Sequence, residues 1–251
     1  MGKFSGILLL SDIDGTIAEN GAISEENRKA VEYFKENGGM FAYASGRTAE
    51  YIKELPISPN VPVIATTGSS IYDCEKNQML YEYTMPNSAV DVMKKMIASY
   101  PLERWYTFTK TGSLYVEGDV PEDFDREMYK VVFVFKNEKD AVAARKRFNE
   151  ECPDFAFERS WSTFLEMRLS SAGKGHCLRI LKEITGARVA VAAGNYENDI
   201  DMLSAADISY VPSDAIDSAK EVADYIGVSF YEDFIAWLIK DIESREELLC
   251  R

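Results

Sequence analysis

The stretch Ser11-Asp12-Ile13-Asp14-Gly15-Thr16 follows an apolar run from Ile7 to Leu10. Such a run is typical of a buried strand, which places the two aspartates at its carboxyl end. Side chains alternate between the faces of a strand, so Asp12 and Asp14 are expected to point the same way. Neighbouring carboxylates repel each other unless a cation holds them or one stays protonated. The spacing therefore predicts a divalent-metal site in which two like groups divide the nucleophile and acid/base roles.

The length and charge of the chain limit what it can be. Its 251 residues suffice for one large domain or two smaller ones, and its formal net charge is −14. That charge argues against nucleic acid or a membrane surface as a partner. A small phosphorylated substrate is compatible with it, because a metal and a few basic side chains reverse the field locally. Scattered cysteines and the lack of a targeting segment indicate reduced thiols in a cytoplasmic protein: Cys74, Cys152, Cys177 and Cys250.

Hydrophobic periodicity divides the chain into three parts. Strands and helices alternate over residues 1–71 and again over 172–251, which is typical of a parallel sheet with helices on its faces. Between them, the expected strands gather as hairpins. The prediction is an α/β fold, with a Rossmann-like parallel-sheet core (1–71 and 172–251) and an inserted α+β domain (72–171).

Local signals near the start support this division. Asn20-Gly21 lies between apolar residues and predicts a tight hairpin. Ser24 is then expected to cap a helix, with Ala30, Val31 and Phe34 as its buried stripe.

The carboxyl ends of the expected parallel strands carry the polar groups. Ligands of open parallel sheets bind at this edge. The groups that meet there are Asp12 and Asp14, Ser45-Gly46-Arg47, Thr66-Thr67-Gly68, the loop 194–199, and Gly173-Lys174-Gly175 where the insert returns. Carboxylates, a hydroxyl, glycines, an arginine and a lysine are the parts of a metal-assisted phosphoryl-transfer site.

Four of these motifs occur in an order and spacing that resemble a known family. They are Asp12–Thr16, Ser45–Arg47, Lys174 and Gly194–Asp199. The chain resembles the haloacid dehalogenase superfamily of phosphatases, and within it the Cof-type sugar-phosphate phosphatases. Their large cap is inserted between the second and third motifs, so the resemblance implies that the insert is a cap domain.

The resemblance also implies roles and a cofactor, Mg²⁺. Asp12 would attack phosphorus and form an aspartyl-phosphate, while Asp14 would protonate the leaving oxygen and then activate water. The Asp12 carboxylate and the Asp14 backbone carbonyl would bind Mg²⁺. Ser45 would hydrogen-bond a phosphoryl oxygen, and Lys174 at a helix N-terminus would neutralise charge.

The chain departs from the family pattern at Asn195, where an aspartate usually binds the metal. An amide oxygen can still bind Mg²⁺, but it brings no charge, so the metal affinity is expected to fall. Asp199 either compensates as a ligand, directly or through a water, or positions Lys174 from behind. Further substrate contacts are expected from Gly46, Arg47 and Asn198.

Some readings stay open on the sequence alone. Ser45 could instead be a helix N-cap, and Arg47 could pair with a core carboxylate instead of the substrate. The expected function is Mg²⁺-dependent hydrolysis of a small phosphorylated metabolite, a sugar phosphate, by a monomer or homodimer. The alternatives are a phosphotransferase or mutase on the same scaffold, and a weakly active phosphometabolite-binding protein. The second alternative rests on Asn195.

Overall fold

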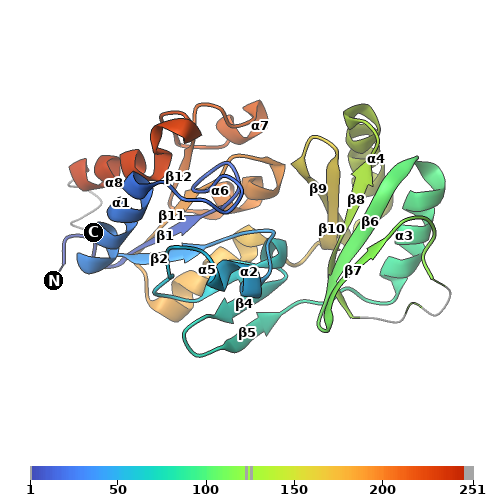
Figure 1. The fold of residues 1–251 in the computed structure, drawn as a ribbon, viewed down its shortest axis with the longest axis horizontal. Coiled ribbons are helices and arrows are strands. Elements are labelled where there is room, and N and C mark those ends of the chain that lie inside the picture. The colour runs from blue at the N-terminus through green and yellow to red at the C-terminus, as the bar shows by residue number, and fades with distance from the viewer. Residues whose placement is uncertain (1, 122–123, 125–126, 246–251) are drawn as a thin grey trace. The chain divides into compact units, whose positions relative to one another are not determined.

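The chain folds into two compact units in a computed structural model that describes residues 2–121, 124 and 127–245 (Figure 1). Unit 1 comprises Met1–Tyr81 and Lys174–Arg251, and unit 2 comprises Glu82–Gly173. The division after Tyr81 falls later than the 71/72 boundary expected from the sequence.

Unit 1 is built on a parallel sheet. Its strands run in the order β13 (Tyr225–Ile226), β12 (Ile208–Val211), β11 (Val189–Ala193), β1 (Ile7–Ser11) and β2 (Met40–Tyr43). All four pairings are parallel. Every residue of β1 and β11 is buried, as expected for parallel strands covered on both faces. The predicted α/β fold with a parallel-sheet core is confirmed.

Six helices belong to unit 1, within the residues described: α1 (Glu25–Glu36), α2 (Ala49–Lys53), α5 (Lys174–Thr185), α6 (Ile200–Ala205), α7 (Asp217–Lys220) and α8 (Phe234–Ser244). α1 packs against α8, and α5 against α6. The single helix expected over 231–246 is interrupted, because Asp233 adopts a left-handed conformation with φ 56° between the 3-10 turn Phe230–Glu232 and α8. Residue 246 lies outside the described residues.

A small second sheet in unit 1 was not anticipated. β3 (Val63–Ala65) was expected to continue the parallel sheet, but it pairs antiparallel with β4 (Ser70–Asp73), which is followed by β5 (Gln78–Glu82). A parallel bridge between Ala44 and Ile64, with the N–H of Ser45 donating to the Ile64 carbonyl, joins β3 to the end of β2. This three-stranded sheet explains why the first segment of unit 1 extends beyond residue 71.

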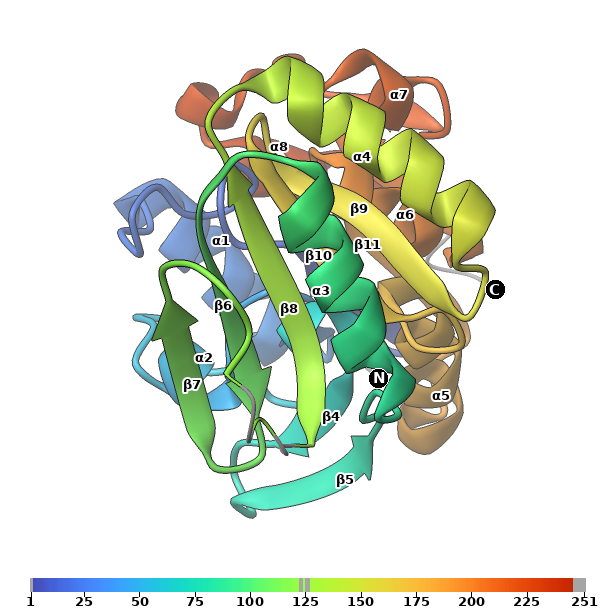
Figure 2. The same ribbon diagram turned by 90° about the vertical axis from the view of Figure 1, so that its right-hand side faces the viewer.

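Unit 2 is an antiparallel sheet with two helices. Its strands run in the order β7 (Gly112–Val116), β6 (Leu102–Thr109), β8 (Met128–Phe135), β10 (Phe164–Leu169) and β9 (Phe155–Trp161). α3 (Ser88–Ser99) and α4 (Glu138–Glu151) cover one face of it (Figure 2). The core between them includes Trp105, Phe133 and Phe148. The sheet also holds a buried ion pair, with Lys130 Nζ 2.9 Å from Glu166 Oε1.

Two further findings bear on the sequence predictions. Among the described residues, no helix combines the length and the apolar character needed to cross a bilayer. Cys74, Cys152 and Cys177 form no disulfide within the described part of the chain, and Cys250 lies outside it.

The contact between α1 and α8 depends on a buried polar side chain. Ser24 caps α1 as predicted, but the buried face of the helix is Asn27, Val31 and Phe34, with Ala30 only partly covered. Asn27 Oδ1 accepts the backbone N–H of Ala236 over 2.9 Å. Ala236 lies in the first turn of α8, where N–H groups have no partner within the helix. Asn27 therefore supplies a cap to a helix distant in sequence.

Asn27→Ala is expected to lower the free energy of unfolding by about 1–3 kcal/mol, because the Ala236 N–H would be left buried without its acceptor. Urea denaturation followed by circular dichroism measures this loss. Arg28→Ala, at an exposed position of the same helix, is the control and should change stability by less than about 0.5 kcal/mol. Equal stability of the two variants would contradict the capping role.

Candidate active site

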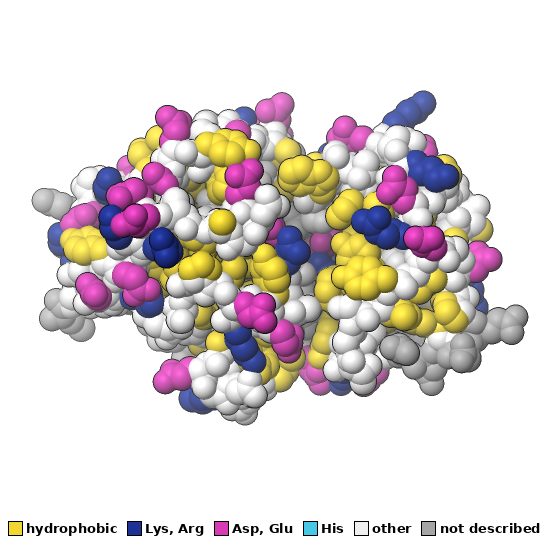
Figure 3. Space-filling view, in the orientation of Figure 1, with side chains coloured by type: hydrophobic (Ala, Val, Ile, Leu, Met, Phe, Trp, Pro, Cys, Tyr) yellow, Lys and Arg dark blue, Asp and Glu magenta, His cyan; other side chains and the backbone are white. Residues whose placement is uncertain are grey.

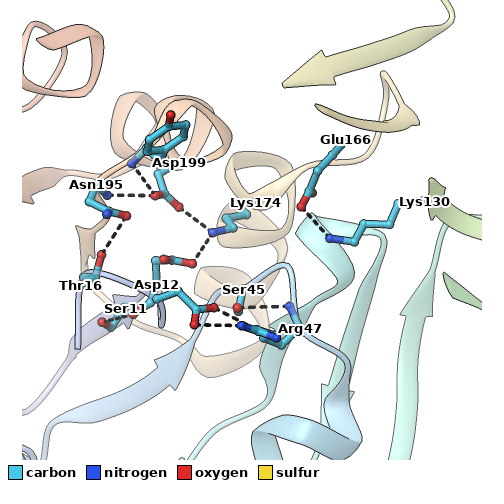
Figure 4. Close-up of polar contacts among 12 residues, drawn as sticks. Ser11, Asp12, Thr16, Ser45, Arg47, Lys130, Glu166, Lys174, Asn195 and Asp199 are labelled. Atoms are coloured by element: carbon cyan, nitrogen blue, oxygen red, sulfur yellow. Dashed lines mark hydrogen bonds and ion pairs between the residues drawn. The ribbon is translucent and has the colours of Figure 1, made fainter. Parts of the chain in front are cut away.

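A buried lysine lies between two carboxylates at the carboxyl edge of the parallel sheet (Figure 4). Lys174, the first residue of α5, is 0% exposed. Its Nζ is 2.7 Å from Asp12 Oδ1 and 2.5 Å from Asp199 Oδ1. Asp12 directly follows β1, and Asp199 follows β11 by a short loop. The predicted residues Asp12, Lys174 and Asp199 are thus in direct contact, although they come from three separate segments.

Burial and charge shift the titration of this cluster. Burial raises the pKa of Asp12 from 3.8 to about 7, and the nearby Asp199 adds to the rise while Lys174 opposes it. Burial disfavours the charged form of Lys174, but Asp12 and Asp199 outweigh it and raise the lysine pKa. Lys174 therefore stays a cation at any physiological pH, and Asp12 is the member of the pair that can change its charge.

Asp199 uses both carboxylate oxygens within the protein. While Oδ1 accepts from Lys174, Oδ2 accepts the backbone N–H groups of Asn195 (2.9 Å) and Tyr196 (3.0 Å). Gly194 allows this arrangement, since a Cβ there would lie 2.6 Å from the Asp199 Cβ. Asp199 is 0% exposed. Two roles were predicted for Asp199, and these bonds favour the positioning of Lys174 over direct ligation of a metal.

Oxygen atoms suited to Mg²⁺ gather beside Asp12. Lys174 takes Oδ1 of Asp12, and Asn195 Oδ1 accepts only a long bond from the Thr16 hydroxyl, 3.4 Å. Gly15 has φ +78°, and a Cβ there would lie 2.5 Å from Asn195 Nδ2. The glycine thus keeps open the space between the β1 and β11 loops. Carboxylate, amide and backbone carbonyl oxygens are hard donors of the kind that Mg²⁺ accepts, so the residues present fit this ion.

Few acidic side chains contribute to this set of oxygen atoms. Among the described residues, no group of three or more His, Cys, Asp or Glu side chains is arranged to hold a metal. The set here would rely on one free carboxylate oxygen, an amide and a main-chain carbonyl, because Asn195 stands in place of an acid and Asp199 is already bonded.

Ser45 lies at the end of β2 and is not a helix cap. It is 1% exposed, and its Oγ accepts the N–H of Arg47 over 3.2 Å. The side chain that caps α2 belongs to Thr48, whose Oγ1 accepts from the N–H of Tyr51. The capping alternative for Ser45 is therefore wrong. Gly46 lies in the same loop, and Asn198 lies in the 3-10 turn Glu197–Asp199 with 7% exposure.

The loop after β3 holds the Ser45–Arg47 loop in place. The N–H of Thr67 donates to the Ser45 carbonyl, and the N–H of Thr66 donates to the Arg47 carbonyl, both over 2.9 Å. Thr66 and Thr67 have φ of 48° and 57°, in the left-handed region. A β-branched residue at positive φ costs about 1–3 kcal/mol, which the surrounding structure must offset. The sequence placed these threonines at the site edge, but their strained backbone is visible only in the structure.

The two aspartates of the first motif take different cations. Strand β1 ends at Ser11, so the alternation expected to align Asp12 with Asp14 does not extend that far. The chain turns instead, and the N–H groups of residues 16, 17 and 18 all point to the Ile13 carbonyl. Asp14 pairs with Arg47, whose Nε and Nη2 lie 2.9 and 3.0 Å from its two oxygens. This pairing with a core carboxylate was one of the two expectations for Arg47.

The sequence profile of the haloacid dehalogenase-like hydrolases matches residues 9–123 and 113–239. The chain belongs to this family. This hydrolase is 27% identical over 241 residues to the 5-amino-6-(5-phospho-D-ribitylamino)uracil phosphatase YcsE of Bacillus subtilis, with 93% of the chain and 94% of the relative covered. It is 25% identical over 253 residues to the phosphoglycolate phosphatase of Methanosarcina acetivorans, with 96% and 98% covered.

Solved structures show the same fold. A haloacid dehalogenase-like hydrolase from B. subtilis superimposes with a TM-score of 0.81 at 20% identity, covering 93% of this chain and 98% of that one. A sugar phosphatase of subclass IIB superimposes with a TM-score of 0.78 at 18% identity, covering 94% and 98%. The family, fold class and phosphatase-type enzyme predicted from the sequence are confirmed.

The raised pKa of Asp12 predicts a pH dependence of stability in the metal-free hydrolase. The folded-state pKa, about 7, lies above the ordinary value of 3.8, so the folded state binds this proton more tightly. That contribution is complete below the ordinary pKa and is lost as the pH rises to about 7. In EDTA, the wild type should lose about 1–3 kcal/mol relative to Asp12→Asn between pH 4 and pH 8, as measured by urea denaturation. A stability difference that does not change with pH would contradict the assignment.

Proposed function

We propose that this hydrolase is a Mg²⁺-dependent phosphomonoesterase that acts on a small phosphorylated metabolite, a sugar phosphate, through an aspartyl-phosphate on Asp12. The observation that carries the proposal is the buried Lys174 ammonium bonded to both Asp12 and Asp199. A cation in this place supports attack by a carboxylate on an anionic phosphoryl group, because it reduces the repulsion between them.

The nucleophilic step assigns a task to each side chain around Asp12. One Asp12 oxygen is held by Lys174, which leaves the other to form the new bond to phosphorus. The Ser45 hydroxyl, almost fully buried at the next strand end, hydrogen-bonds a phosphoryl oxygen. The N-terminus of α5 adds the positive end of a 12-residue helix to the charge of Lys174. Gly46 and Asn198 border the same edge as further substrate contacts.

Asp14 handles the protons. As the bond between phosphorus and the leaving oxygen breaks, protonated Asp14 donates its proton to that oxygen. The resulting carboxylate then takes a proton from the water that attacks the aspartyl-phosphate, which releases phosphate and restores both aspartates. Asp14 suits exchange with substrate and water because its side chain is 41% exposed, whereas that of Asp12 is 10% exposed.

Mg²⁺ would be held by the Asp12 carboxylate, the Asp14 backbone carbonyl and Asn195 Oδ1. Bound there, the ion supplies positive charge to the phosphoryl oxygens. Asp199 supports the site indirectly, since it fixes Lys174 and the backbone of Asn195.

The choice of a small metabolite rests on charge and on the relatives. The net charge is −14, and acidic and basic side chains are interspersed over the face drawn in Figure 3. A polyanion such as nucleic acid needs a basic field that this distribution does not supply. Relatives named for a phosphorylated ribitylaminouracil and for phosphoglycolate act on small phosphate esters. A sugar phosphate is the substrate class that unites these features with the subclass IIB structural neighbour.

Asp12→Asn is expected to reduce phosphate release from 4-nitrophenyl phosphate by at least about 1,000-fold, because an amide cannot form the aspartyl-phosphate. A steady-state assay with and without Mg²⁺ measures this loss. Asp217→Asn, at a side chain 98% exposed, is the matched control and should retain wild-type turnover. Substantial turnover by a folded Asp12→Asn variant would overturn the mechanism.

Asn195→Asp is expected to tighten Mg²⁺ binding by about tenfold or more, because it replaces a neutral ligand with a charged one. Isothermal titration calorimetry of the substrate-free protein gives the affinity. The melting temperature without metal should fall, because a third acid would lie near Asp12 and Asp199. The control is Asn87→Asp, which makes the same charge change at an exposed position of unit 2.

Unchanged Mg²⁺ affinity in Asn195→Asp would show that residue 195 does not ligate the metal. Asn195 also favours one rival function, a phosphometabolite-binding protein with little activity. That rival predicts no Mg²⁺-dependent turnover by the wild type in the aryl phosphate assay, with gain of turnover in Asn195→Asp.

A further inference from the structure

The carboxylate of Asp14 is held in a two-pronged contact with Arg47. Arg47 Nε donates to Oδ2 over 2.9 Å and Nη2 donates to Oδ1 over 3.0 Å. A planar guanidinium that contacts both oxygens fixes the plane of the carboxyl group as well as its position. A carboxylate has about four lone-pair positions, so the fork leaves two of them for other partners.

Arg47 is itself fixed at several points. Its backbone N–H is bonded to Ser45 Oγ, and its carbonyl accepts the N–H of Thr66 in the strained loop after β3. Its guanidinium carbon lies 4.8 Å from the centre of the Tyr51 ring in α2. The hairpin predicted at Asn20-Gly21 forms, with Glu19 and Ala22 paired across the turn. Tyr51 is close to this turn, since a Cβ on Gly21 would lie 2.9 Å from the tyrosine hydroxyl oxygen.

The pair does little for the stability of the fold. The side chains of Arg47 and Asp14 are 46% and 41% exposed, and exposed ion pairs contribute about 0–1 kcal/mol. Two hydrogen bonds and an aromatic ring fix this pair more tightly than its small contribution to stability would explain. Its effect is to remove rotational freedom from a carboxyl group whose direction decides whether a proton can be delivered.

We propose that Arg47, supported by the Tyr51 ring, is a positioning residue for Asp14. It holds the acid/base carboxyl so that its remaining lone pairs face the leaving oxygen, and it acts through Asp14 without binding the phosphoryl group. The inference rests on the proposed function. Of the two roles that the sequence left open for Arg47, it builds on the pairing with a carboxylate, which is the contact that the fork makes.

The test compares two substrates that differ in their need for a general acid. The 4-nitrophenolate of 4-nitrophenyl phosphate leaves without a proton, whereas the more basic phenolate of phenyl phosphate benefits from one. Because kcat/KM reports the steps up to departure of the leaving group, Arg47→Ala should lower it about 10- to 100-fold for phenyl phosphate and less than about threefold for 4-nitrophenyl phosphate. Arg47→Lys, which keeps the charge but loses the fork, should show the same selectivity with a smaller loss.

The Tyr51 support is tested by a second pair of variants. Tyr51→Leu removes the ring beneath Arg47 and should shift the ratio of the two kcat/KM values in the same direction as Arg47→Ala. Tyr51→Phe keeps the ring and should keep the wild-type ratio. Melting temperatures of all variants identify a folding defect, which would lower both kcat/KM values by the same factor.

Two results would overturn the inference, and they can be distinguished. If Arg47→Ala lowers kcat/KM equally for both substrates, with KM raised for both, Arg47 binds the phosphoryl group and the positioning role is wrong while the phosphatase proposal stands. If the wild type turns over neither substrate in the presence of Mg²⁺, the proposed function fails and the positioning role fails with it.

Discussion

The architecture of the site depends on one buried cation. Lys174 has no exposed surface and is bonded to Asp12 and Asp199, which belong to different segments of unit 1. An ammonium ion without partners cannot be buried at reasonable cost, and removal of one partner from a buried pair costs about 3–5 kcal/mol. The need to balance the charge of Lys174 therefore holds the ends of β1, β11 and α5 close together. The same requirement places a cation next to Asp12, the carboxylate proposed as the nucleophile.

The two aspartates of the first motif have similar chemistry but different surroundings. Asp12 is nearly buried, and burial raises its pKa to about 7, while its contact with Lys174 opposes that rise. Asp14 is half-exposed and bonded to Arg47. These different surroundings and cations support the separate tasks proposed for the two carboxylates. The turn after β1 makes the separation possible, because it directs residue 14 toward the Ser45–Arg47 loop.

Several features of this site could be read from the order of residues, and others could not. The strand ends, the capping role of Ser24 and the Asn20-Gly21 hairpin follow from local patterns, since each depends on neighbours in sequence. The role of Asp199 depends on the use of both its carboxylate oxygens. The partner of Arg47 lies 33 positions away in sequence. The antiparallel β3–β4 pairing was missed because β3 has only three residues, too few to show which sheet it joins. Asn27 was missed because a polar residue within an apolar stripe gives no sign of the distant backbone N–H that donates to it.

By itself, the sequence determined the family, the parallel-sheet core with its insert, and the set of residues at the carboxyl edge of the sheet. Those conclusions rest on periodicity and motif spacing, which are properties of the linear chain. The tertiary structure decided which of these residues touch. In the folded protein, Lys174 contacts two carboxylates and both oxygens of Asp199 accept hydrogen bonds from protein groups. Asp14 is paired with Arg47. Those outcomes arise from burial and from competition for hydrogen-bond partners, which exist only once distant segments have packed together.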